Sequence, residues 1–186
     1  MTKTTYYTAS TLDGFIADEH HSLDWLFQFG GPGDDWQELA AGVGAYAIGA
    51  HTYEWALENH VYAKPDEPAP WPHAHPTWVF TTRELRPVPN ADIRFVRGDV
   101  RPVHQEMVAE ASGKNVWLVG GGELVGQFHD HGLLDELIVT IASVTLGGGA
   151  PLLPREIVTP PLRLLSAEQW GEDFVQLRYE VRRPGG

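Results

Sequence analysis

The residues whose type and spacing most clearly suit ligand binding are three consecutive glycines at positions 120–122. They lie in the segment VWLVGGGELVGQF (116–128). A run suited to a buried strand stops at these glycines, and a helical pattern follows at once. Glycines lack a Cβ, so a ligand's phosphates can approach the backbone, and the N–H groups at a helix start favour negative charge. The pattern predicts a pyrophosphate site over Gly120 and Gly121; the alternative is a tight turn without a ligand. Val125 occupies the third glycine position of G-x-G-x-x-G, which disfavours a standard Rossmann opening.

Two other segments place small, hydroxyl or cationic residues directly after a strand pattern. In AYAIGAHTYEW (45–55), Gly49 ends the strand, and Thr52 either caps the following helix or contacts a phosphate. In VFTTRE (79–84), Thr82 and Arg83 follow the strand, and Arg83 is either a solvated charge or a ligand contact. Ligands of open α/β sheets bind at the carboxyl ends of strands, so the three segments together predict one ligand site.

Pairs of histidines and of carboxylates could bind a metal ion or act in acid–base catalysis, but their spacing argues against both roles. His73 and His75 lie among prolines and therefore in a loop, and His129 and His131 are two apart on a predicted helix, where side chains diverge. Adjacent carboxylates also point apart on regular elements. We therefore predict no metal site and no catalysis by a carboxylate pair.

Composition narrows the class of protein. The length of 186 residues suits one domain, which we predict to span positions 1–186. The absence of cysteine excludes disulfides, thiolate zinc sites and iron–sulfur clusters. A net charge of −12 without a basic stripe predicts no nucleic-acid partner. No apolar segment is long enough for a bilayer and no signal peptide is visible, so we expect no membrane association and a cytoplasmic location.

The elements that must position these residues alternate between strand and helix patterns. We predict an α/β fold with a mostly parallel central sheet, flanked by helices, and an antiparallel C-terminal edge. Apolar alternation on that edge predicts a homodimer that covers it. Gly- and Pro-rich loops are expected at 62–76 and 147–154. Strands are expected at 6–10, 15–17, 45–49, 77–81, 93–96, 116–119, 137–142, 162–166 and 174–181, and helices from Asp34 or Asp35 to about 41, at 52–59, 102–112 and 122–131.

Five segments, in this order, carry a resemblance to a known family: TASTLDGFIAD (8–18), YAIGAHTYEW (46–55), VFTTRE (79–84), VWLVGGGELVGQF (116–128) and DELIVTIASVTLGGGAPLLP (135–154). The chain resembles the dihydrofolate reductase superfamily, in particular the reductase domain of riboflavin biosynthesis, the RibD C-terminal domain. The resemblance implies a dihydrofolate reductase-like fold with NADPH as cofactor and NADH as the second candidate. It implies a substrate-side loop around Asp13, and either water or a polar residue of this loop such as Asp13 is expected to relay the proton. The implied cofactor contacts are Ala9, Ile16, Gly49, His51, Thr52, Thr82, Arg83, Gly120, Gly121, Gly122 and Glu123, and the implied substrate contacts are Trp25, Asp34 and Thr140.

The implied activity is hydride transfer from a reduced nicotinamide to a small heterocycle, of the 5-amino-6-(5-phosphoribosylamino)uracil or dihydrofolate kind. Ala50 stands where the family usually has arginine, so Arg83 is the clear cation for a 2′-phosphate, with His51 as a partial substitute. Asp34 and Asp35 also fit helix caps, so no firm counterpart of the pterin-binding carboxylate exists, and folate is not the first predicted substrate. The alternative is a non-catalytic dinucleotide-binding or sensor module on the same fold, which would bind the cofactor without turnover.

Overall fold

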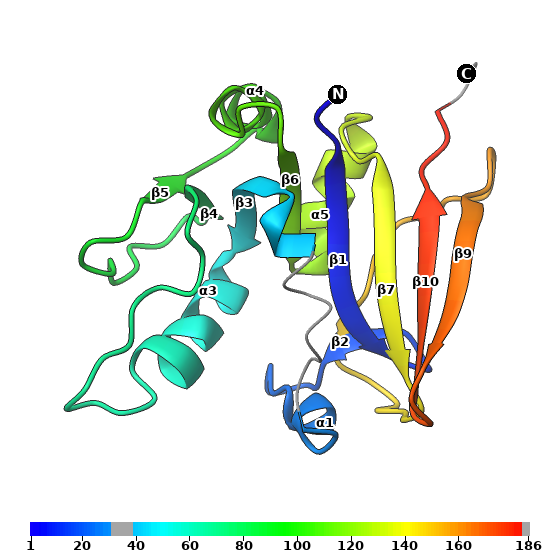
Figure 1. The fold of residues 1–186 in the computed structure, drawn as a ribbon, viewed down its shortest axis with the longest axis horizontal. Coiled ribbons are helices and arrows are strands. Elements are labelled where there is room, and N and C mark those ends of the chain that lie inside the picture. The colour runs from blue at the N-terminus through cyan, green and yellow to red at the C-terminus, as the bar shows by residue number, and fades with distance from the viewer. Residues whose placement is uncertain (31–38, 184–186) are drawn as a thin grey trace.

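The computed structural model describes residues 1–30 and 39–183, and an eight-stranded sheet forms its centre (Figure 1). The strand order is β5-β4-β3-β6-β1-β7-β10-β9. The strands from β5 to β7 pair in parallel, whereas β10 pairs antiparallel with both β7 and β9. The predicted fold class is therefore confirmed. The strand bounds are β1 (Thr4–Thr11), β3 (Val43–Gly49), β4 (Thr77–Phe80), β5 (Ile93–Val96), β6 (Asn115–Gly120), β7 (Glu136–Ala142), β9 (Arg163–Trp170) and β10 (Phe174–Glu180).

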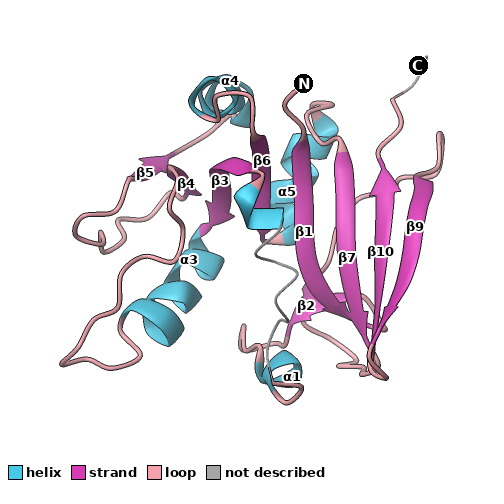
Figure 2. Ribbon diagram, in the orientation of Figure 1, coloured by secondary structure: helices cyan, strands magenta, loops and turns pink. Residues whose placement is uncertain are grey.

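The alternation of side chains along the central strands decides which helices cover each face of the sheet. Ala45 and Ala47 of β3 pack in one core cluster with residues of α4 (Val100–Glu110) and α5 (Gly122–Asp130). Ile48 of the same strand packs with residues of α3 (Ala50–Ala56) and of the π-helical turn η1 (Leu57–Val61). Because neighbouring strand residues point to opposite faces, α4 and α5 cover one face and α3 covers the other (Figure 2).

A small second sheet lies beside the carboxyl ends of the parallel strands (Figure 1). It pairs β2 (Phe15–Ala17) with β8 (Ala150–Pro151), which lies inside the segment that we expected to be a loop. The short helix α1 (Asp24–Phe27) follows β2 and was not predicted. The predicted helix from Asp34 or Asp35 to about 41 begins outside the described residues, and residues 39–41 are helical.

Two helices begin earlier than their sequence patterns predicted, and their first residues explain why. Helix α3 begins at Ala50 with Gly49 as its N-cap, so the prediction that Thr52 caps this helix is wrong. Helix α4 begins at Val100 because the Asp99 carboxylate accepts a hydrogen bond from the backbone N–H of Arg101 at 2.9 Å.

The last strand pair forms one edge of the sheet. Every residue of β9 is exposed or half-buried, including Leu164 and Leu165, which are 53% and 44% exposed. The homodimer prediction rests on this apolar edge. Among the described residues, no helix has the length and apolar character needed to cross a membrane.

Candidate functional site

The two glycine turns meet at the carboxyl edge of the sheet. Strands β3 and β6 are neighbours, and Ile48 is registered with Gly120. A Cβ on Gly49 would lie 3.4 Å from the backbone N of Gly121, and one on Gly120 would lie 3.5 Å from the Thr52 Oγ1. Gly49, Thr52, Gly120 and Gly121, predicted as cofactor contacts from separate segments, therefore form one surface built largely of backbone.

Ile16 borders this surface from the second sheet. Among the described residues, a Cβ on Gly121 would meet only the Ile16 Cδ1, at 3.8 Å, so none of them fills the space in front of this glycine. Ala9 is registered with Thr140 on the neighbouring strands β1 and β7. Ile16, Ala9 and Thr140, which were predicted as cofactor or substrate contacts, thus lie between the glycine turns and the antiparallel strand β10.

Gly122 and Glu123 have structural partners of their own. A Cβ on Gly122 would collide with the carbonyl oxygens of Pro151 and Leu152, so a side chain here would displace the loop that carries β8. The Glu123 carboxylate accepts two hydrogen bonds from the Arg155 guanidinium, at 2.8 and 2.9 Å, and Arg155 holds the pKa of Glu123 below its ordinary value. The start of α5 can therefore offer backbone N–H groups to an anion, while the side chain of Glu123 is engaged elsewhere.

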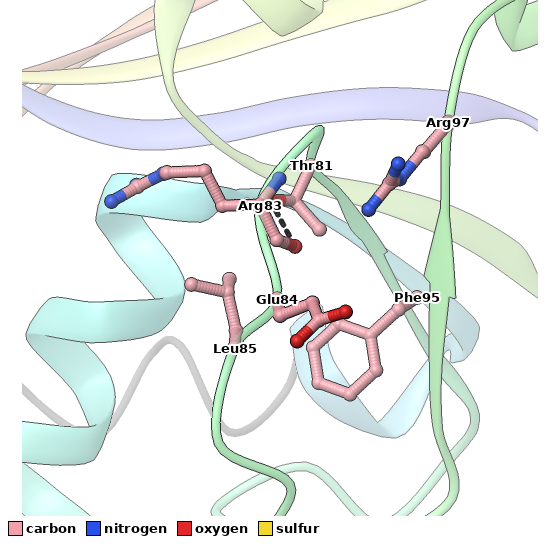
Figure 3. A pocket seen from close by; sticks show the side chains of 6 residues that line it. All are labelled: Thr81, Arg83, Glu84, Leu85, Phe95 and Arg97. Atoms are coloured by element: carbon pink, nitrogen blue, oxygen red, sulfur yellow. Dashed lines mark hydrogen bonds between the residues drawn. The ribbon is translucent and has the colours of Figure 1, made fainter.

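A pocket of about 340 Å³ opens at the carboxyl ends of β4 and β5 (Figure 3). Its walls include two arginines: Arg83, which extends toward α3, and Arg97, which extends toward Thr81. The Arg83 guanidinium donates to both Glu54 carboxylate oxygens, at 2.9 and 2.7 Å. The pocket is lined by Thr81, Arg83, Glu84, Leu85, Phe95 and Arg97.

Sequence reasoning missed part of this pocket. Thr82 was expected beside Arg83, but the threonine in the lining is Thr81, whose Oγ1 accepts from the Arg83 backbone N–H at 2.9 Å. Arg97 was missed although it also follows a strand directly, which is the signal that identified Arg83. His51, the expected substitute for a second arginine, stacks on His21, with ring centroids 4.4 Å apart.

Asp13 joins two loops at the other end of the same edge. Its carboxylate accepts hydrogen bonds from the Thr11 hydroxyl at 2.6 Å and from the backbone N–H groups of Leu146 and Gly147, the latter at 2.7 Å. The Thr11 hydrogen bond is the main cause that holds the pKa of Asp13 below its ordinary value, and the backbone donors add to it. A carboxylate held in this way favours a positioning role over the proton relay expected from the sequence.

Aromatic side chains gather near the residues expected to contact substrate. Trp25 is buried in α1, and within the described chain its Nε1 has no hydrogen-bond partner. Phe27 stacks on Trp55 of α3, at 5.8 Å between centroids with parallel rings, and Phe29 makes an edge contact with Phe174 at 4.9 Å. Asp34, the remaining predicted substrate contact, lies outside the described residues.

No group of three or more histidines, aspartates or glutamates with metal-binding geometry occurs in residues 1–30 and 39–183. In the part of the chain that the structure describes, the site therefore consists of backbone turns, a pocket with two arginines and an aromatic region, without such a group.

Comparisons with known proteins agree with the fold described above. A model of the RibD C-terminal domain matches residues 2–176. The uncharacterized protein YwjB of Bacillus subtilis is 33% identical over 95% of this chain and 97% of its own length. A putative riboflavin biosynthesis protein from Shewanella sp. PV-4 has a similar structure, with a TM-score of 0.78, 24% identity and coverage of 98% of this chain and 100% of that one. Dihydrofolate reductase from Enterococcus faecalis, complexed with NADP(H), has a TM-score of 0.59, 14% identity and coverage of 96% and 95% of the two chains.

Proposed function

Because the chain belongs to the RibD C-terminal domain family, we propose that it is a reductase that transfers a hydride from a nicotinamide dinucleotide to a small planar heterocycle. The observation that carries the proposal is the meeting of Gly49, Thr52, Gly120 and Gly121 at one edge of the sheet. This surface consists of backbone and one hydroxyl, and no described side chain fills the space before Gly121. It suits a pyrophosphate, which a row of side chains would hold at a distance.

The residues on either side of the glycine turns fit the two ends of a dinucleotide. On the β4–β5 side, Arg83 and Arg97 line a pocket of about 340 Å³, which suits an adenosine that carries a 2′-phosphate. On the β1 side, Ile16 and the backbone of Ala9 would border the nicotinamide. The bound cofactor would supply the hydride, and the chain would supply orientation and a site from which water is excluded.

We propose NADPH rather than NADH as the preferred cofactor, with a moderate preference. Two arginines favour the 2′-phosphate that only NADPH has, but the Glu54 carboxylate already holds Arg83. Ala50 supplies no third cation at the start of α3. The preference then depends on how far Arg83 can exchange Glu54 for the phosphate.

The substrate would lie beyond the nicotinamide, against β1 and β7. Thr140 lies next to Ala9 there, and its Oγ1 accepts a hydrogen bond from the Gln176 side chain at 3.2 Å. Reduction adds a hydride from the dinucleotide and one proton from water to a C=N or C=O bond. Since Asp13 is ionised and held by three donors, it would orient the loops around the substrate while water supplies the proton.

The test is NADPH and NADH oxidation, followed at 340 nm, against pteridines, aminopyrimidine ribosides and quinonoid compounds. We expect oxidation with at least one acceptor and a product two mass units heavier than the acceptor. Heat-denatured protein is the control. Dinucleotide binding without oxidation of any acceptor would favour the non-catalytic sensor, and the absence of dinucleotide binding would contradict the proposal.

A further inference from the structure

The cationic side chains are distributed unevenly along the carboxyl edge of the sheet. Arg83 and Arg97 line the pocket beyond β4 and β5. By contrast, the sequence contains no lysine or arginine at positions 4–63, 115–154 or 164–177. These three stretches include the loop after β1, the loop after β7 and the turn before β10, which surround the proposed substrate position.

The arginines near β7 and β10 lie at the opposite end of these strands, away from the proposed substrate position. Arg178 pairs with Glu136, the first residue of β7, and Arg183 pairs with Asp135, one residue earlier. Strand β7 extends from Glu136 to Ala142, so these pairs are about 20 Å from its carboxyl end. Arg155 is held on α5 by Glu123 and Asp130, at 2.8 Å each. Within the described residues, no cation is thus positioned to meet a phosphate on the substrate.

The same region carries acidic side chains instead. Asp13 lies in the loop after β1, and Asp18 and Glu19 follow β2. A hydrogen bond from the Ser22 backbone is the main cause that holds the pKa of Asp18 below its ordinary value, so both aspartates are ionised near neutral pH. Glu172 and Asp173 form the turn that precedes β10. A phosphate dianion placed here would meet like charges, which raises its free energy.

Aromatic rings supply the attraction that this region does offer. The Phe29–Phe174 pair connects the segment after α1 with the first residue of β10, and the Phe27–Trp55 stack connects α1 with α3. Aromatic surfaces favour planar rings, and they favour cationic rings further because of their quadrupole.

We propose that the ring reduced by this chain carries no phosphate and is neutral or cationic. This inference rests on the proposed function, whose substrate it restricts. The inference excludes 5-amino-6-(5-phosphoribosylamino)uracil as the substrate of this chain. The phosphate of that compound needs cationic or N–H partners to replace its hydration. The expected substrate is an unphosphorylated planar heterocycle.

The test uses pairs of compounds that differ only in the phosphate: 5-amino-6-ribosylaminouracil with its 5′-phosphate, and dihydroneopterin with its monophosphate. Each is titrated calorimetrically into the chain saturated with NADP⁺, after tryptophan fluorescence has confirmed that the dinucleotide binds. We expect the unphosphorylated member to bind at least about tenfold more tightly. The phosphate would lose hydration without gaining the charge-assisted contact that a cation would supply, and one such contact contributes about that factor. Equal or tighter binding of the phosphorylated member overturns the inference. If the chain binds NADP⁺ but neither unphosphorylated compound, the inference is also overturned. That result would not contradict the proposed function.

A charge placed on the substrate side gives an independent measurement. Leu12 follows β1 directly and is 68% exposed, so Leu12→Lys adds a cation without removing a buried contact. We expect it to raise the affinity for the phosphorylated member of a pair about three- to tenfold. The control is Leu165→Lys on β9, at 44% exposure, which should change neither member. If both lysines have an equal effect, or if neither has one, the inference that like charges at this edge disfavour a phosphate is contradicted.

If NADP⁺ does not bind at all, the proposed function is contradicted. The two members of each pair can then still be compared by titration into the free chain.

Discussion

The two halves of the carboxyl edge share one sheet but differ in what they offer a ligand. The half built on β3, β4, β5 and β6 offers glycine backbone and two arginines, which suits a long anionic molecule. The half built on β1, β7 and β10 offers aromatic rings and ionised aspartates, which suits a flat ring without negative charge. The comparison teaches that one edge of a sheet can offer two neighbouring surfaces that differ both in charge and in the kind of group they present.

The halves also differ in what holds them together. At the glycine turns, the sheet register brings Gly49 and Gly121 into contact, so the geometry depends on the absence of side chains. In the other half, the loops are joined by hydrogen bonds to the Asp13 carboxylate and by the pairing of β2 with β8. A substitution should therefore block ligand binding in the first half and loosen loop positions in the second.

The largest expected effect is the loss of dinucleotide binding in Gly121→Val. A side chain here would occupy the space proposed for the pyrophosphate. In the described part of the chain, a Cβ meets only the Ile16 Cδ1, at 3.8 Å, so we expect the fold to survive. We expect affinity for NADPH to fall at least about 100-fold, as followed by tryptophan fluorescence. Gly42→Val, at the amino end of β3, is the matched control and should bind normally. Unchanged affinity in a folded Gly121→Val protein would remove the cofactor from this turn.

Mild acid should destabilise the half built on β3, β4, β5 and β6 through His73. This side chain packs against Tyr46 of β3 and Trp117 of β6, and burial lowers its pKa from 6.5 to about 4, with a small contribution from His60. The unfolded chain therefore binds one more proton between these values, so stability is complete above about pH 6.5 and falls as the pH drops toward 4. We expect the free energy of unfolding in urea to fall by about 2 kcal/mol between pH 7 and pH 5 because of this group.

The variant His73→Phe keeps a ring in the stack and removes the titrating group. Its unfolding free energy should fall less than that of the wild type over the same pH interval. An identical fall in both proteins would mean that other groups, such as His104, cause the acid sensitivity.

Cofactor preference should shift in Arg83→Ala. We expect NADPH affinity to fall about tenfold and NADH affinity to change little, because only NADPH carries the 2′-phosphate. Glu54→Gln should raise NADPH preference a few-fold by releasing Arg83 from its carboxylate partner. Arg86→Ala is the control, since Arg86 packs over the Tyr62 ring. If Arg83→Ala weakens NADH binding as much as NADPH binding, Arg83 does not contact the 2′-phosphate.

A smaller effect is expected from Asp13→Asn. The amide keeps one oxygen acceptor for the backbone donors of the 143–147 loop, so we expect Tm to fall by about 2–4 °C and kcat to fall less than about tenfold. The pH profile of kcat should keep its shape. A fall of 100-fold or more together with an altered pH profile would instead indicate that Asp13 transfers a proton during the reaction.

The smallest effect is expected from a chelator. The segment after β2 contains a run of charged and histidine residues, Asp18, Glu19, His20 and His21. Their geometry forms no metal site among the described residues. We expect EDTA to leave Tm unchanged and elemental analysis to find no stoichiometric metal. One metal ion per chain would contradict this expectation.

Local patterns in the sequence predicted the strands of the main sheet, the helices after β3, β5 and β6, and the two glycine turns, but not α1 or β8. Gly49 and Gly120 each end a short apolar run, and this signal requires no knowledge of distant residues. The antiparallel edge was also predictable, because β9 and β10 are separated by a short polar turn.

The contacts between distant segments were not predictable in the same way. Which threonine faces the pocket depends on where β4 ends, and Arg97 enters only because Phe80 is registered with Val96. The pairing of Arg83 with Glu54 and of Asp13 with Leu146 joins residues 29 and 133 positions apart. No periodic pattern encodes such pairs, because each depends on how the whole sheet is assembled.

The most direct test of the division between the two halves is a crystal structure of the chain with NADPH. The account predicts the pyrophosphate against Gly120 and Gly121, the 2′-phosphate between Arg83 and Arg97, and the nicotinamide between Ile16 and Ala9. A dinucleotide bound with its phosphates on the β1–β7–β10 half, among the aspartates and aromatic rings, would contradict the account.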